Sequence, residues 1–403
     1  MGPADYALIG VGLLAAAALF HPRLLKSDQW RATVTPLASI IGSGFLVAGP
    51  VLASLAGNLA IAAMLGLCAA GYLFGSAIRY NIAHVEPGLD GGAPRAVKGL
   101  ERVSELALAL AYFVSVAYYL HLFAAFGLRL GEITDPVWIR AAATVVIATV
   151  GLIGGLAGLN GLEKLAIGAV ALKLAVIAGL FGGLAVAAGL AIHGGTFAWS
   201  APVPEAGLTD LRVLLGLVIL VQGFETSRFL GAAYDGPLRI RTMRHAQWIA
   251  TAIYLVFFLL ITSHFTGSES QGSGETAIID ILRPVGIIIA PAIILAALAS
   301  QLSAAVADMN GAGGLLHEVS GHRVRVRWGN VVTAAVAIVI VWTSNIYEII
   351  TWASRAFVLY YALQSIQAAW AAGRQGDRAR VALFVGAILL AGVVLVFAIP
   401  AQG

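Results

Sequence analysis

The sequence of 403 residues is poor in charge: Asp, Glu, Lys and Arg make up 11% of it, whereas 60% of its residues are hydrophobic. Soluble domains carry about twice this charged fraction, because charged side chains have to cover their surface. The mean hydropathy of +0.91 points the same way. The composition therefore excludes a soluble protein and predicts an integral membrane protein.

The chain has a single cysteine, Cys68, which excludes an internal disulfide and a cysteine-based metal cluster. It lacks a phosphate-binding Gly-x-x-x-x-Gly-Lys loop, a Gly-x-Ser-x-Gly nucleophile elbow and a dinucleotide fingerprint. His317, Glu318 and His322 resemble a zinc protease motif, but the second histidine comes five residues after the first and misses the helix face that ligation requires. We therefore expect no enzymatic activity, no cofactor and no metal site. The scattered basic residues also predict no nucleic-acid partner.

The hydrophobic residues gather into blocks, most of them close to the length of about 20 residues that a transmembrane helix needs. The blocks lie at about 4–20, 33–56, 57–79, 104–127, 137–158, 165–192, 211–234, 247–265, 285–306, 329–344, 347–371 and 380–399. The first block carries Asp5 and no basic residue ahead of its apolar core, which favours a span over a signal peptide. The pattern predicts an all-α integral membrane protein of about twelve transmembrane helices.

Basic residues divide the connecting loops into two alternating groups. One group contains 17 of the 24 Lys and Arg residues, and the other contains only Arg129, Arg140, Arg212 and Arg283. Cytoplasmic loops are enriched in Lys and Arg, so the first group is predicted to face the cytoplasm and both termini the opposite side. We expect the chain to lie in the lipid bilayer of the inner or plasma membrane.

Charged residues inside the predicted spans are few. Lys173, Arg228 and Arg355 are basic, and Glu225 lies three residues before Arg228. Ionisable groups at membrane depth are costly and usually face a protein interior or a water-filled cavity. Glu225 and Arg228 would share a helix face and neutralise each other. Either arginine is also a candidate for an anionic substrate group, with pairing to a buried acid as the alternative.

Two spans contain sequences that weaken a helix near the middle. The first contains Gly42, Ser43 and Gly44, and the second contains Gly223 two residues before Glu225. Glycine lowers helix stability and lets a ligand approach the backbone closely. The two positions predict interrupted helices that form a substrate site, with close helix packing as the alternative use of the glycines.

The positions of the two breaks suggest an internal repeat. Five spans from 33 to 192 and five from 211 to 371 are nearly equal in length, and each set begins with a weakened helix. An odd number of spans inverts the second repeat relative to the first. We therefore expect a five-plus-five inverted repeat with a discontinuous first helix in each repeat. The transport core is predicted at 33–371, with an added helix and linker at 1–32 and another helix at 372–403.

These features resemble the amino acid/polyamine/organocation (APC) transporter superfamily, with the LeuT-type fold. The resemblance is carried by Ile-Gly-Ser-Gly-Phe at 41–45, Gly-Gly at 91–92, the segment 161–174, Gly-Phe-Glu at 223–225 and Asp-Gly-Pro-Leu-Arg-Ile-Arg at 235–241. It implies that backbone N–H groups of Ile41, Gly42, Ser43 and Gly44 bind the anionic end of a substrate. Gly223 and Phe224 are implied at its cationic end, with Glu225 in a structural or gating role. Phe224 is either a gate over the substrate or a packed core aromatic.

Lys173 is expected roughly 12 Å deep, about eight residues into its span. The resemblance implies that its ammonium replaces a bound sodium ion, as in members that work without sodium. A lysine there can exchange a proton as the cavity opens and closes, so we expect sodium-independent and proton-coupled transport. A lysine that extends to the cytoplasmic interface is one alternative. Ser300 and Ser303, as part of a sodium site, are another.

The sequence therefore predicts a secondary active transporter that moves an amino acid or a related organic amine by alternating access. The segment 264–283 is expected to form an external lid with a short amphipathic helix. An inorganic ion or organic anion carrier on the same scaffold is one alternative. A non-transporting membrane receptor or subunit is the other. No oligomeric state is predicted.

Overall fold

The computed structural model describes residues 1–89, 91, 92, 94–198, 207–265 and 274–401, with all of their side chains except those of 43 and 160–167. These residues form helices and no strand, which confirms the all-α class. The longer helices are α1 (Pro3–Leu19), α3 (Asp28–Ala56), α4 (Ala60–His84), α6 (Arg95–Leu128), α7 (Pro136–Leu156), α8 (Asn160–His193), α9 (Leu208–Leu215), α10 (Gly236–Ile261), α12 (Ile289–Val319), α13 (Val326–Thr343), α14 (Ile346–Arg374) and α15 (Arg378–Phe397).

Short helical turns connect these helices. Three are α-helical: α2 (Pro22–Leu25), α5 (Glu86–Leu89) and α11 (Ile278–Leu282). The others are 3₁₀ turns: η1 (Gly57–Leu59), η2 (Arg129–Gly131), η3 (Val218–Val221), η4 (Phe224–Ala232), η5 (Thr262–His264), η6 (Gly274–Thr276) and η7 (Arg283–Val285). The short helix expected in the external segment is present as α11. The part of that segment at 266–273 lies outside the described residues.

Eight segments of the described chain are long and apolar enough to cross a membrane. One of them, 28–84, contains both α3 and α4, which η1 joins. Each hydrophobic block of the sequence coincides with helical structure. Several boundaries differ from the prediction: α6 begins at Arg95 and not at 104, and α10 begins at Gly236 and not at 247. The block at 211–234 is divided among α9, η3 and η4, and α12 continues well past 306.

Polar residues in the loops determine where several helices begin. The Asp135 side chain accepts hydrogen bonds from the first backbone N–H groups of α7, and Asp235 does the same at α10. Asn345 caps α14 in a capping box with Glu348. These caps satisfy N–H groups that have no partner within the helix, so each helix starts at a defined residue.

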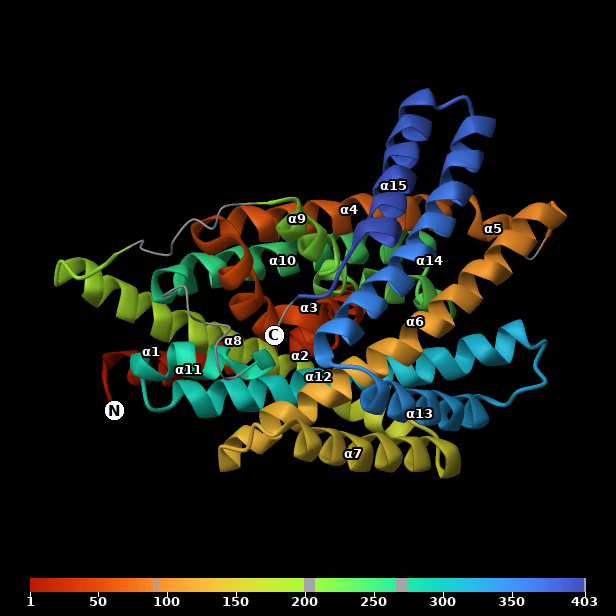
Figure 1. Cartoon of the computed structure of the whole chain (residues 1–403). Coiled ribbons are helices and arrows are strands. Elements are labelled where there is room, and N and C mark those ends of the chain that lie inside the picture. Colours follow the sequence, from red (N-terminus) through yellow and green to blue (C-terminus); the bar gives the residue numbers. More distant parts are fainter. Residues whose placement is uncertain (90, 93, 199–206, 266–273, 402–403) are drawn as a thin grey trace.

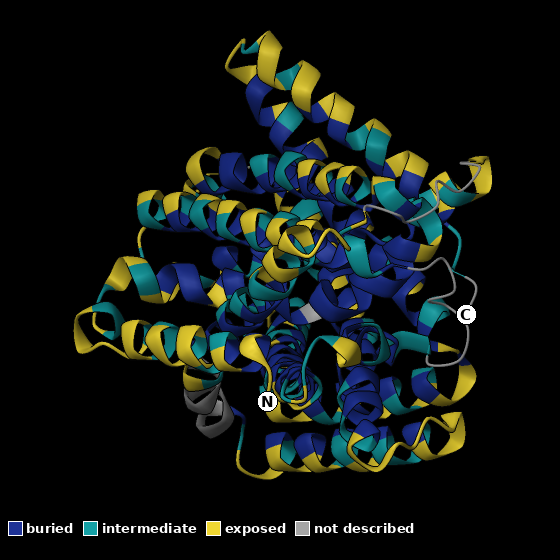
Figure 2. Ribbon diagram, turned by 90° about the vertical axis from the view of Figure 1, so that its left-hand side faces the viewer, coloured by how far each residue is buried: buried dark blue, intermediate teal, exposed yellow. Residues whose placement is uncertain are grey.

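The helices pack around two central helices, α3 and α6. In Figure 1 most of the long helices run across the view, α6 crosses them at an angle, and α14 and α15 form a hairpin that extends away from the others. Figure 2, turned by 90°, shows buried residues in the middle and exposed residues around the outside. At the edge, α1 packs along α8, where Gly179 and Gly183 let the two backbones approach closely. The arrangement leaves α3, η3 and the first part of η4 together in the interior.

Candidate functional site

The second predicted break is present. Between η3 and η4 the chain leaves the helical conformation, with Gln222 extended and Gly223 at a φ of +115°. A side chain at Gly223 would also collide with α3, because a Cβ there would lie 2.6 Å from the backbone nitrogen of Ile40. Only glycine fits both the conformation and the contact. The glycine beside Glu225 therefore does mark an interrupted helix.

The first predicted break is absent, because α3 is helical through Gly42, Ser43 and Gly44. Its glycines allow close packing instead. A Cβ at Gly42 would lie 2.9 Å from the Cβ of Ala304 in α12, and one at Gly44 would lie 2.7 Å from the Cα of Leu220 in η3. Neighbouring elements thus hold the weakened stretch in helical form. The side chain of Ser43 lies outside the described residues.

We expect Gly44→Ala to lower the free energy of unfolding by about 1–3 kcal/mol, the usual cost of overpacking a core. The added methyl group would meet the backbone of Leu220, which cannot rotate away. Gly66→Ala is the matched control, since nothing lies within 4 Å of the added atom in α4. Denaturant titration in detergent micelles compares the two. Equal stability of both variants would contradict the proposed role of Gly44.

Glu225 and Phe224 are both fully buried beside the break. The Glu225 Oε2 accepts hydrogen bonds from the Gly223 N–H at 2.9 Å and from the Tyr361 hydroxyl at 2.8 Å. Phe224 stacks on the Tyr361 ring, with the ring centroids 5.0 Å apart, and Tyr361 in turn stacks on Phe74. In this conformation Phe224 is a packed aromatic, and Tyr361 of α14 anchors the start of η4.

Three buried oxygens around the break have no hydrogen-bond partner among the described residues: Ser39 Oγ in α3, Gln222 Oε1 and Glu225 Oε1. The Ser39 side chain lies directly against Gly223. Buried polar groups are usually paired in a folded protein, so these three oxygens are candidates for contact with a polar ligand. All three oxygens can accept a hydrogen bond.

Lys173 of α8 is completely buried and reaches α3. Its Nζ donates to the carbonyl oxygen of Ala38 at 2.7 Å and lies 3.5 Å from Ser300 Oγ of α12. Ser300 Oγ also lies 3.4 Å from the carbonyl oxygens of Ile41 and Gly42. The ammonium thus sits among oxygens of α3 and α12. The alternative in which Lys173 extends to the interface does not hold in this structure.

The two serines proposed for a sodium site have different hydrogen-bond partners. Ser300 faces the Lys173 ammonium, whereas Ser303 Oγ donates to the carbonyl oxygen of Ser300 within α12 at 2.9 Å. The lysine therefore lies where a cation bound by Ser300 and α3 carbonyls would be.

Arg228 does not neutralise Glu225, so that prediction is wrong. Its guanidinium lies 2.8 Å from the Glu101 carboxylate of α6 and also donates to Gln364 Oε1 of α14. The Glu225 carboxylate instead accepts a hydrogen bond from the Gly223 N–H at the N-terminal end of η4. Arg355 donates to the carbonyl oxygen of Ala398 at 2.5 Å, so its partner is backbone and not the buried acid considered as an alternative.

Asp308 is a buried acid near this site that the sequence did not reveal. The predicted span ended at 306, but α12 continues to Val319 and places Asp308 inside the bundle. Its Oδ2 accepts a hydrogen bond from Ser115 Oγ of α6 at 2.5 Å. An acid within an apolar helix was the available signal.

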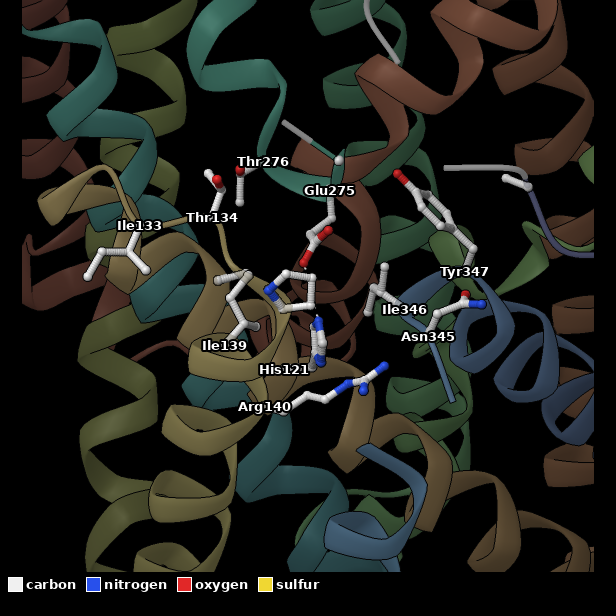
Figure 3. A pocket seen from close by; sticks show the side chains of 14 residues that line it. His121, Ile133, Thr134, Ile139, Arg140, Glu275, Thr276, Asn345, Ile346 and Tyr347 are labelled. Carbon is white, nitrogen blue, oxygen red and sulfur yellow. Dashed lines mark hydrogen bonds and ion pairs between the residues drawn. The ribbon is translucent and has the colours of Figure 1, made fainter. Parts of the chain in front are cut away.

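A cavity of about 570 Å³ lies among α6, α7, η6 and α14 (Figure 3). Glu275 of η6 points toward His121 of α6, and their Oε1 and Nε2 atoms are 3.2 Å apart. Arg140 and Tyr347 line the same cavity. The contact between Glu275 and His121 holds this part of the segment 264–283 against the helix bundle. Sequence could not pair His121 with Glu275, because 154 residues separate them.

The chain is similar to a known protein family and to a protein of another organism. The family described as "APC superfamily transporter" matches residues 22–398. An uncharacterized protein of Aquifex aeolicus (strain VF5) is 38% identical over 384 residues, which cover 94% of this chain and 93% of that relative. The matched region contains every helix that contributes to the site around α3.

Proposed function

The chain belongs to the APC superfamily of transporters, and from this premise we propose that it carries an amino acid or a related organic amine by alternating access. The family and the eight apolar segments make it a multi-pass membrane protein. We further propose the cell membrane as its location, with both termini on the extracytoplasmic side, because its Lys and Arg residues gather in alternate loops.

The observation that carries the amine proposal is the group of unpaired oxygens beside Gly223. Ser39 Oγ, Gln222 Oε1 and Glu225 Oε1 all accept hydrogen bonds, and an ammonium group has three donors to offer. A cationic partner is what a fully buried carboxylate such as Glu225 needs in order to carry its charge. We propose that the substrate amine binds here, beside Phe224.

We propose that the substrate carboxylate binds to backbone N–H groups of residues 41–44 after this part of α3 opens. Gly42 and Gly44 each lower helix stability by about 1 kcal/mol relative to alanine, so this stretch of α3 is intrinsically weak. The stretch also faces the break across the contact between Gly44 and Leu220. We therefore keep the same residues as the proposed binding site for the anionic end of the substrate: Ile41, Gly42, Ser43 and Gly44. Lys173 lies beside this part of α3.

We propose that transport does not need sodium, because the Lys173 ammonium already lies among the oxygens of Ala38 and Ser300. A primary amine can gain and lose a proton, so the same residue is the proposed site of proton coupling. Loss of its proton would remove the charge-assisted hydrogen bond to Ala38, which links the protonation state to the packing of α3 against α8.

We propose a LeuT-type arrangement, with repeats at 33–192 and 211–371 inside a core at 33–371 and added helices within 1–32 and 372–403. The cavity at His121 and Glu275 is the proposed access route from the extracytoplasmic side, because it lies on the side of the loops that are poor in Lys and Arg. Glu275 and its neighbours would act there as the external lid.

The alternative of an anion carrier depended on two arginines. Arg228 is engaged by Glu101 and Gln364, and Arg355 by a backbone carbonyl, so these contacts give an anionic substrate no support. The alternative of a receptor without transport draws no support from the family, whose members are described as transporters.

A thermal-shift screen of purified protein tests the substrate class. Amino acids and amines are screened at two pH values, with and without sodium, because a ligand that binds the folded state raises its apparent stability. We expect a shift with at least one amino acid or amine in sodium-free buffer, and its loss in Glu225→Gln. Shifts only with organic acids lacking an amine would overturn the proposal.

A further inference from the structure

The turn after α12 brings His317 and His322 together despite their spacing of five. The N–H of His322 donates to the carbonyl oxygen of His317 at 2.8 Å, and that of Gly321 donates to Glu318 at 2.9 Å. Gly321 has a φ of +64°. These two bonds form a Schellman motif, which brings the second residue after the cap back against the last turn of the helix. The helix-face argument against ligation fails, because α12 has ended before His322.

The two imidazoles lie close enough together to share one metal ion. His322 Nδ1 lies 3.0 Å from His317 Nε2. Two nitrogens that bind one zinc ion at about 2.0–2.1 Å lie roughly 3 to 3.4 Å apart, so a metal ion can bridge these two with little movement. The backbone already holds the residues that carry them in this position.

The ring of His317 is also fixed from behind. Its Nδ1 lies 2.8 Å from the carbonyl oxygen of Val324. A carbonyl only accepts hydrogen bonds, so Nδ1 carries the proton and Nε2 presents its lone pair toward His322. Ser320 fastens the same turn, donating to the carbonyl oxygen of His317 and accepting from the Val324 N–H, each at 3.0 Å. An N–H to carbonyl contact of this kind orients most metal-binding histidines.

Glu318 supplies a third ligand atom. One ligand atom from each of the three residues can be chosen so that all lie within 4.8 Å of one another, and a small side-chain movement would bring the Glu318 carboxylate onto an ion held by the imidazoles. The Glu318 and His322 side chains are 61% and 65% exposed, so an ion can reach them from solvent and keep a water ligand. Two imidazoles and a carboxylate suit zinc and its neighbours better than magnesium or calcium.

We propose that His317, Glu318 and His322 bind a divalent transition-metal ion of the zinc class at the end of α12. Arg323 and Arg325 come shortly after His322, and their positive charges disfavour a bound cation. The negative charge of Glu318 offsets this repulsion. The site is separate from the transport site, although α12 also carries Ser300. Zinc binding would restrain the turn between α12 and α13.

Titration calorimetry with zinc chloride tests this on the full-length protein in detergent, without a histidine tag. We expect one zinc ion per chain. His317→Ala and His322→Ala should each weaken binding by at least about tenfold, since even the loss of a hydrogen bond behind a ligand costs about 10–100-fold. His193→Ala, which removes an exposed histidine at the end of α8, should leave binding unchanged, and magnesium should not bind.

A second measurement separates ligation from an indirect structural effect. With Cu²⁺ as the probe, electron paramagnetic resonance should detect two coupled imidazole nitrogens in the wild type and one in His322→Gln, a variant of similar size on an exposed turn. The proposal is overturned if zinc does not bind the wild type, which would leave only a hydrogen bond between the histidines. Zinc affinity that is unchanged in both histidine variants would also overturn it.

Discussion

Replacing Arg228 with methionine is expected to lower the free energy of unfolding by about 3–5 kcal/mol, the usual cost of leaving one partner of a buried ion pair alone. The Arg228 and Glu101 side chains are only 6% and 12% exposed, and their charged atoms are 2.8 Å apart. The pair joins η4 to α6, and Gln364 extends the contact to α14. Denaturant titration in detergent micelles measures the loss.

The double variant Glu101→Gln/Arg228→Met should be more stable than Arg228→Met alone, because no buried charge is then left without a partner. Arg283→Met is the matched control. It removes an ion pair with Glu132 of comparable length, 2.6 Å, but with side chains 52% and 61% exposed, where water screens the charges. Little change is expected there. If the double variant were no more stable than Arg228→Met, the ion pair would not be what stabilises this region.

Replacing Lys173 with methionine is expected to reduce the initial rate of substrate uptake roughly 10- to 150-fold. Hydrogen bonds from charged groups contribute about 1.5–3 kcal/mol, and each 1.4 kcal/mol corresponds to a factor of about ten. Methionine fills much of the same space but cannot donate to Ala38 or interact with Ser300. Uptake into proteoliposomes measures the rate, and gel filtration shows whether the variant is folded.

Lys98→Met provides the matched control. Lys98 also donates to a backbone carbonyl, that of Gly91, but it is exposed and lies near the start of α6. Its loss should leave uptake unchanged. A Lys173→Met variant that transports as fast as Lys98→Met would show that the buried ammonium has no part in the transport cycle.

The spans could be predicted from the sequence because polar and charged residues are rare inside them. The second break was also predictable, since Gly223 beside Glu225 is unsuited to a helix facing lipid. The outcome at Gly42 and Gly44 was not. Glycine both weakens a helix and allows another backbone to approach, and only the positions of Ala304 and Leu220 show that packing keeps α3 helical in this conformation.

Contacts between residues far apart in the chain could not be predicted from the sequence. The partner of Arg228 is Glu101 on another helix, although Glu225 lies only three residues away. Asp308 was missed for a different reason, because helix ends are poorly marked where hydrophobicity fades gradually. His322 was set aside since the spacing rule assumes a continuing helix, which Gly321 ends.

Uptake of the substrate found in the ligand screen, measured in proteoliposomes with and without sodium, tests most directly whether Lys173 replaces a sodium ion. We expect the wild type to accumulate substrate at the same initial rate when choline replaces sodium on both sides, and Lys173→Ala to fail in either buffer. Uptake that requires sodium and survives Lys173→Ala would contradict the account.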